Sequence, residues 1–174
     1  MIIDLHTHFF PEKIALRALE KMSIASKTRY FTDGTAAGLA ASMRAEGADL
    51  SVNLPVMTSP AQVEKVNSSL IAQKDRLFAD GILTFGGIHP DSEDFKSERR
   101  RLRDNGIKGI KLHPAYQRTD IDDIRYLRIM GYASELGLTI VTHAGLDIGI
   151  PGKNWASVDG ILNVIRNVAP EKLI

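Results

Sequence analysis

The stretch Met1–Phe10 reads MIIDLHTHFF, and the rest of the sequence can be organised around it. Its apolar residues predict a short buried strand. Because side chains alternate along a strand, Asp4, His6 and His8 are expected to point to the same face. Two neutral imidazoles on one face can converge on a divalent ion, at about 2.0–2.1 Å per nitrogen. At this point a pair of histidines that only form hydrogen bonds is the alternative.

The composition suits one globular domain, which we place at residues 1–174. The chain is 44% hydrophobic and has a formal net charge of +1, which favours neither a nucleic-acid nor a membrane partner. The one basic cluster, residues 99–103, is expected on a solvated helix face. Cysteine is absent, so a metal would need histidine, carboxylate or modified lysine. No signal peptide or membrane-length apolar run is recognised, so the cytoplasm is the expected compartment.

Predicted strands and helices alternate along the chain. Strands are expected at residues 1–8, 50–54, 82–88, 107–113 and 138–143, and residues 172–174 resemble the opening of a sixth. Helices are expected from Pro11 to Met22, from Thr35 to Gly47, from Ser59 to Leu70, from Asp91 or Ser92 to Leu102, from Thr119 or Asp120 to Gly137, and over 161–168, with residues 23–34 irregular. This alternation is typical of right-handed βα units and a parallel sheet.

The histidines favour a barrel over a doubly wound sheet. His6, His8, His113 and His143 all fall at the ends of predicted strands. In a (β/α) barrel the active site is built where the strands end. We therefore predict an α/β fold of the TIM-barrel type. It should be incomplete, with five βα units and the start of a sixth strand, because eight units usually take roughly 250 residues.

If the terminal histidines face inward, the inward and outward side chains of each strand are fixed. Lys111 and His113 then line the interior from the fourth strand, while Ile110 and Leu112 contact the helices. An inward lysine is costly to bury unless it is paired or neutral, so Lys111 is a candidate functional residue.

Four segments resemble the amidohydrolase superfamily, and most closely its branch of TIM-barrel metal-dependent hydrolases and non-oxidative decarboxylases. They are DLHTHFFPEKIA (4–15), GGIHP (86–90), KGIKLHPAYQ (108–117) and TIVTHAG (139–145). The resemblance implies that His6, His8 and His143 are metal ligands. Three imidazoles without sulfur suit Zn²⁺ most simply, with Mn or Fe as alternatives. The family pattern adds a histidine after a sixth strand and an aspartate after an eighth, and this sequence contains neither position.

We assign Lys111 and His113 to catalysis. Three interpretations of Lys111 stay open: it contacts an anionic substrate group, it is carbamylated and bridges two metals as in binuclear relatives, or it pairs with a structural carboxylate such as Asp4. His113 is expected to contact the substrate or a metal ligand, with a structural histidine as the alternative.

Loops at the same end of the strands supply the predicted substrate-binding residues Tyr116, Arg118 and Trp155. Arg118 can grip a carboxylate with two nitrogens, although exposed loop arginines are often only solvated. Trp155 belongs to the loop 144–157, which is long for a βα connection and favours a lid. Packing of Trp155 on the next helix is the alternative.

The predicted function is hydrolysis of an amide, ester or lactone of a small polar molecule by metal-activated water. The alternatives are a non-oxidative decarboxylase or hydratase on the same metal, a histidinol-phosphatase-like phosphoesterase, and an inactive partial barrel. An open arc of strands exposes edges and apolar side chains to water. We therefore expect either a missing C-terminal segment, this sequence being the N-terminal two-thirds of a longer amidohydrolase, or a homo-oligomer partner.

Overall fold

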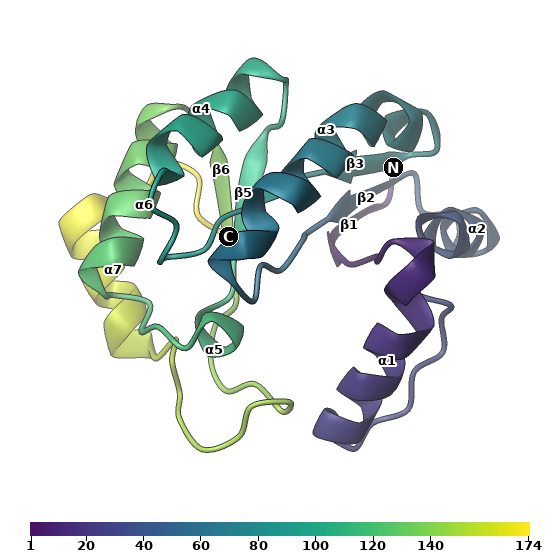
Figure 1. Cartoon of the computed structure of the whole chain (residues 1–174), viewed down its shortest axis with the longest axis horizontal. Coiled ribbons are helices and arrows are strands. Elements are labelled where there is room, and N and C mark those ends of the chain that lie inside the picture. Colours follow the sequence, from purple (N-terminus) through teal and green to yellow (C-terminus); the bar gives the residue numbers. More distant parts are fainter.

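Parallel strands in chain order form the inner layer of the molecule (Figure 1). The computed structural model describes residues 1–174. The strands are β1 (Ile3–Thr7), β2 (Leu50–Asn53), β3 (Ile82–Thr84), β4 (Gly86–Gly87), β5 (Gly109–Leu112) and β6 (Thr139–Thr142). Beyond β6, Leu173 forms a parallel bridge with Ile140, which places the predicted start of a sixth strand. The predicted α/β fold with an incomplete barrel of parallel strands is confirmed.

The helices are α1 (Glu12–Ser26), α2 (Ala36–Glu46), the 3₁₀ turn η1 (Pro60–Gln62), α3 (Val63–Ala79), α4 (Phe95–Asp104), α5 (Pro114–Gln117), α6 (Ile124–Glu135) and α7 (Val158–Val168). Most of them lie on the outer side of the strands, whereas α1 extends away from the sheet and α5 lies beyond the strand ends (Figure 1). Both ends of α2 lie where the sequence predicts them. The Thr35 hydroxyl accepts the N–H of Gly38 at 3.0 Å, and Gly47 adopts φ 74°, which a glycine tolerates without strain. None of the helices combines the length and apolar character needed to cross a membrane.

The core confirms which side chains of β5 were predicted to face the helices and which the interior. Ile110 and Leu112 belong to a buried cluster with Leu102 of α4 and Ile129 of α6, so they face the helices. Lys111 is paired in register with Val141 and points the opposite way, because side chains alternate along a strand. The inner face also carries a smaller apolar cluster, formed by Val52, Leu54, Phe85 and Val141.

The start of α4 and the end of α1 differ from the prediction. α1 continues through Ser26 into residues expected to be irregular, because no glycine or proline interrupts residues 12–26. α4 is capped by Asp94 and not by Asp91 or Ser92. The Asp94 carboxylate accepts the N–H of Ser97 at 3.2 Å, and this satisfies one of the free donors of the first turn.

Two further boundaries were predicted wrongly. α6 begins after Asp123 and not at Thr119 or Asp120, since the Asp123 carboxylate accepts the N–H of Arg125 at 2.9 Å. The predicted third strand is broken at Phe85. β3 before the break pairs with β2, and β4 after it pairs with β5, so the strands form two three-stranded sheets, β1-β2-β3 and β4-β5-β6.

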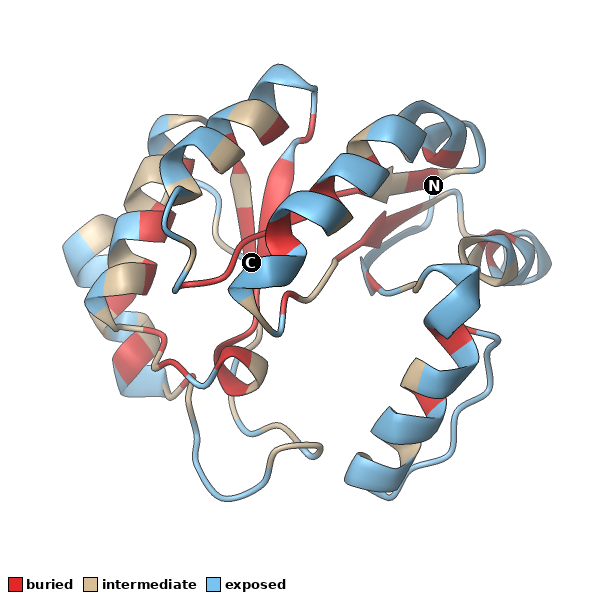
Figure 2. Cartoon of the chain, viewed as in Figure 1, coloured by how far each residue is buried: buried red, intermediate tan, exposed pale blue.

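The first strand is exposed, although the sequence predicts a buried one. Ile2, Ile3 and Leu5 are 60%, 43% and 50% exposed. β1 is the edge of the sheet, and Figure 2 shows it and α1 largely in the colour of exposed residues, in contrast to β5. The side chains lack a covering layer, which is the physical reason for the difference.

A bulge interrupts β1 between Asp4 and Thr7, in the segment that contains His6. Asp4 pairs with Ser51, but Thr7 pairs with Asn53, so β1 uses three steps where β2 uses two. Such an extra residue bends a strand and redirects its side chains. Simple alternation along residues 1–8 therefore does not hold, and Thr7 becomes the buried residue that donates to the carbonyl of Val52 at 2.9 Å.

One arginine of the basic cluster is buried, which corrects the expectation of a solvated helix face. Arg99 is fully buried in the interface of α4 and α6, over the rings of Phe95 and Tyr132, and it donates to the carbonyl of Ile129. Its Nε and Nη2 have no partner. Burial lowers the pKa of Arg99 to about 9. The side chain thus fills space in the core at the cost of an unpaired charge.

Arg99→Met is expected to leave the free energy of unfolding unchanged or to raise it by about 1 kcal/mol, because an apolar chain of similar length fills the space without a buried charge. Arg99→Ala is expected to lower it by about 2 kcal/mol or more, because it leaves a cavity. Urea unfolding of both variants checks this. A larger loss for the methionine variant than for the alanine variant would contradict it.

Candidate metal centre

Histidines from three strands lie at the carboxyl ends of those strands. The short helix α5, which follows β5, marks this end in Figure 1. His6 and His8 lie at the end of β1, His113 directly follows β5, and His143 directly follows β6. The parallel direction of the strands brings these ends together, as the sequence predicts.

His8 is oriented by the neighbouring strand. Its Nδ1 lies 2.7 Å from the carbonyl oxygen of Leu54, and because a carbonyl only accepts, Nδ1 carries the proton. Nε2 therefore keeps its lone pair in the neutral ring. We call this carboxyl-terminal end of the strands the mouth. Burial in the mouth lowers the pKa of His8 to about 4, so the ring is neutral at pH 7. The rings of His6 and His8 stand edge to face with centroids 5.1 Å apart.

Lys111 reaches His6 across the inner face. Its Nζ lies 3.3 Å from His6 Nε2, and it forms no salt bridge. Burial lowers the pKa of Lys111 to about 8. The proposed pairing with Asp4 is absent, since Asp4 instead accepts the backbone N–H of His6 at 3.0 Å. The interpretations as a substrate contact and as a carbamylated bridge stay predictions.

His113 and His143 stack against each other beside a carboxylate. Their rings are nearly parallel, with an angle of 8° and centroids 4.4 Å apart. Asp147 Oδ2 lies 3.6 Å from His113 Nε2 and 4.0 Å from His143 Nε2. Burial, and then the neighbouring His143, lowers the pKa of His113 to about 3. These three residues place their candidate ligand atoms within 4.8 Å of one another, whereas His6 and His8 lie outside that group.

Five basic side chains lie near one another at the mouth, namely His6, His8, Lys111, His113 and His143. Burial lowers the pKa of His6, and Lys111 and His143 lower it further. Lys111 and His8 also contribute to the lowered pKa of His113. Such charge effects reach about 10 Å, so the residues from β1, β5 and β6 border one mouth, while only His113, His143 and Asp147 have ligand atoms within 4.8 Å of one another.

The histidines fit a divalent ion in their chemistry. The neutral imidazole is the form that ligates, and burial favours it at His6 and His8. The Nε2 of His143 is buried and has no hydrogen-bond partner, which is unusual for a buried polar atom. A bound cation would supply the missing partner. The contact of Lys111 with His6 Nε2 is long for a hydrogen bond, so an ion can replace it.

Gln117 holds this mouth together, a role that sequence reasoning missed. Its Nε2 donates to the carbonyls of Met57 at 2.9 Å and Ile88 at 2.7 Å. Its Oε1 accepts the N–H of His113 at 3.0 Å and the hydroxyl of Tyr126. One buried amide thus joins β5 and α6 to the loops that follow β2 and β4.

The predicted substrate-binding residues have different surroundings. The Tyr116 ring meets the His113 ring edge to face at 4.6 Å, so Tyr116 borders the site. Arg118 is exposed, and its side chain forms no hydrogen bond or ion pair with the histidines. Trp155 is half-buried under Lys153, whose ammonium lies 4.0 Å from the ring centre, and its backbone carbonyl accepts the N–H of Ile121. Only Tyr116 is brought to the cluster.

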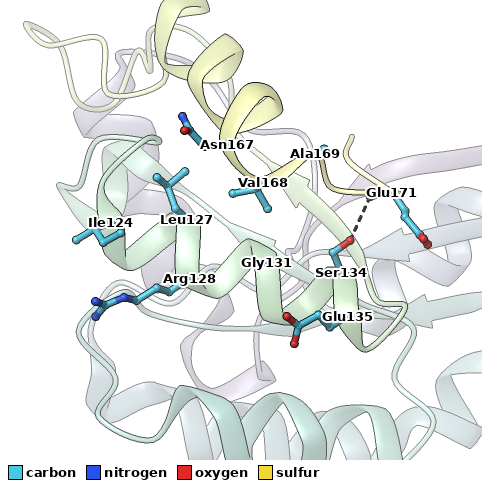
Figure 3. A pocket seen from close by; sticks show the side chains of 10 residues that line it. All are labelled: Ile124, Leu127, Arg128, Gly131, Ser134, Glu135, Asn167, Val168, Ala169 and Glu171. Carbon is cyan, nitrogen blue, oxygen red and sulfur yellow. Dashed lines mark hydrogen bonds between the residues drawn. The ribbon is translucent and has the colours of Figure 1, made fainter.

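A groove of about 670 Å³ lies between α6 and the end of α7 (Figure 3). Ser134 lines it and accepts the N–H of Glu171 at 3.2 Å. None of its lining residues is a histidine, an aspartate or a lysine. The groove therefore does not compete with the histidine cluster as a candidate active site.

Comparison with known proteins identifies a family. The model of the family described as Amidohydrolase matches residues 3–165. No curated protein matches the chain significantly.

Several solved structures share the fold. IDCase from Metarhizium anisopliae is 18% identical with a TM-score of 0.63, and the match covers 88% of this chain and 53% of that one. A manganese-bound 5-carboxyvanillate decarboxylase from Novosphingobium aromaticivorans is 16% identical with a TM-score of 0.59, covering 83% and 51%. A putative 2-pyrone-4,6-dicarboxylic acid hydrolase from Pseudomonas putida is 18% identical with a TM-score of 0.56, covering 98% and 54%. The chain thus spans about half the length of each of these structures.

Proposed function

Because the chain belongs to the amidohydrolase family, we propose that it carries the metal site of a hydrolase acting on an amide, ester or lactone of a small polar molecule. His6, His8 and His143 are the proposed ligands, with Zn²⁺ as the simplest choice and Mn or Fe as alternatives. The observation that carries the proposal is the neutral His8 ring, whose Nδ1 is committed to the Leu54 carbonyl and whose Nε2 is free. When bound, such an ion polarises a carbonyl group and lowers the pKa of water to about 7.

The chain's own residues would bind and orient the substrate. Lys111 places a buried cation on the inner face, where it attracts a carboxylate of the substrate. His113 can hold or move a proton at Nε2, which faces the mouth beside Asp147. Tyr116 borders His113 and is the best-supported substrate contact. Arg118 and Trp155 would contribute only after their loops move.

A non-oxidative decarboxylase is the second candidate. It is supported by two structures of similar fold, the 5-carboxyvanillate decarboxylase described above and a 2,6-dihydroxybenzoate decarboxylase from Rhizobium. Lys111 suits this reaction equally well, because the substrate again carries a carboxylate. The family match gives no comparable support to a histidinol-phosphatase-like phosphoesterase.

Further polypeptide is proposed to cover the exposed edge at β1. Ile2, Ile3 and Leu5 face water there, and an uncovered edge strand with apolar side chains favours association. The cover would be either a C-terminal segment of a longer protein or a second copy of this chain. It would also be the source of the remaining polar groups of the family site.

Activity of the chain with and without metal tests the function. The purified protein is stripped with a chelator, reloaded with Zn²⁺ or Mn²⁺, and offered lactones, esters and amides that carry a carboxylate, and separately aromatic carboxylic acids. We expect metal-dependent hydrolysis in the first group. Release of carbon dioxide from the second group instead would favour the decarboxylase. Stoichiometric metal binding without either reaction would support the partial barrel that needs a partner.

A further inference from the structure

We propose that Asp147 is a further ligand of the ion, supplying a carboxylate beside the three imidazoles of the site proposed above. This inference rests on the proposed function, because it concerns the same metal. Its basis is the position of Asp147 next to a histidine nitrogen that has no other partner.

One carboxylate oxygen of Asp147 is free for a ligand. Oδ1 accepts the N–H of Gly149 at 2.8 Å, which fixes the side chain within the loop. Oδ2 points at the stacked pair of His113 and His143. The side chain is 13% exposed and has no lysine or arginine partner. A largely buried carboxylate without a cation is costly unless a positive charge reaches it.

The distance to His143 suits two ligands of one ion. Asp147 Oδ2 and His143 Nε2 are 4.0 Å apart, and no donor reaches either atom well. With bonds of about 2.0–2.2 Å, neighbouring ligand atoms on tetrahedral Zn²⁺ lie roughly 3.3 Å apart. A movement of about 0.7 Å would therefore bring both atoms to ligand spacing.

His113 fits as the residue that orients Asp147. Its Nδ1 accepts the backbone N–H of Tyr116 at 3.4 Å, so in the neutral ring the proton is on Nε2. That N–H faces Asp147 Oδ2 at 3.6 Å. Carboxylates that bind a metal are themselves commonly held by a hydrogen bond, and His113 can supply it.

Ligation by Asp147 would tie the loop 144–157 to the ion. The loop is internally paired, with bridges from Gly145 to Ala156 and from Asp147 to Ile150. Its tip still exposes Leu146 and Ile148. A metal contact at Asp147 would fix this tip over the mouth.

Zinc titration of the whole chain tests the ligand. We expect Asp147→Asn to raise the Zn²⁺ dissociation constant by about 10-fold or more. Asp147→Glu, which restores a carboxylate, should recover part of the affinity. Asp91→Asn is the matched control, since Asp91 is an exposed carboxylate paired with Arg125, and it should bind Zn²⁺ like the wild type. Unchanged affinity in Asp147→Asn would overturn the proposal.

Hydrogen exchange provides a second readout. Zn²⁺ should protect the amides of residues 145–150 in the wild type and not in Asp147→Asn, and equal protection in both would also overturn the proposal.

His8→Ala separates this inference from the proposed function. Lost binding in His8→Ala with normal binding in Asp147→Asn removes Asp147 alone. The reverse pattern supports Asp147 and removes the β1 histidines from the ligand set.

Discussion

Gln117→Leu is expected to lower the free energy of unfolding by about 4 kcal/mol, because it removes four hydrogen bonds from a buried place at once. The carbonyls of Met57 and Ile88, the N–H of His113 and the hydroxyl of Tyr126 would all lose their partner. Each buried polar group left unsatisfied costs about 1–3 kcal/mol, and relaxation recovers part of the sum.

Denaturant unfolding of three variants checks this expectation. Gln73→Leu makes the same chemical change on the exposed face of α3 and should shift the free energy of unfolding by no more than about 0.5 kcal/mol. Tyr126→Phe removes one of the four bonds and should cost about 1–2 kcal/mol. If Gln117→Leu costs no more than Tyr126→Phe, Gln117 does not join the elements of the mouth.

The strand pattern was predictable because it depends on short-range rules. Alternation of side chains places Lys111 opposite Ile110 and Leu112 whatever the partners of the strand are, and the structure agrees. The cap of α2 at Thr35 and its end at Gly47 follow equally local chemistry. Local rules are therefore sufficient to predict the fold class and the faces to which the side chains of β5 point.

Two kinds of feature were not predictable: those for which several nearby residues are equally suitable, and those that depend on how two elements pack. Several aspartates precede α4 and α6, and each can cap a helix, so the sequence does not decide that Asp94 and Asp123 do so. The bulge in β1 depends on how β1 meets β2. Arg99 shows the same limit, since its burial follows from the packing of α4 on α6.

The histidines of the site could be found from the sequence, but Asp147 and Gln117 could not. The histidines stand at strand ends, where a parallel sheet brings side chains together. Asp147 lies four residues after His143 in a loop, and only the return of that loop places it beside His113. A carboxylate shortly after a strand-end histidine is the one signal available. Gln117 looks like any loop residue until its four partners are known.

His8→Ala is expected to weaken Zn²⁺ binding by at least about 100-fold, because it deletes a ligand whose ring is held in place before the ion arrives. The hydrogen bond from Nδ1 to Leu54 fixes the ring, so binding costs little ordering of this side chain. At a Zn²⁺ concentration of about 100 times the dissociation constant, the ion should stabilise the wild type by about 2.7 kcal/mol. For a chain of this size that corresponds to a rise in Tm of roughly 5 to 11 °C.

Thermal unfolding with and without Zn²⁺ measures this difference. The variant should keep its fold, with a loss of about 1 kcal/mol for the deleted hydrogen bond, and at the same Zn²⁺ concentration its Tm should rise by no more than about 1 to 2 °C. His89→Ala is the matched control. Its ring lies beside Asp91 and Arg125, outside the cluster, so the Zn²⁺-dependent rise in Tm should persist. An equal rise in all three proteins would place the ion away from β1, since a ligand that binds the folded state alone must lose its effect when its site is removed.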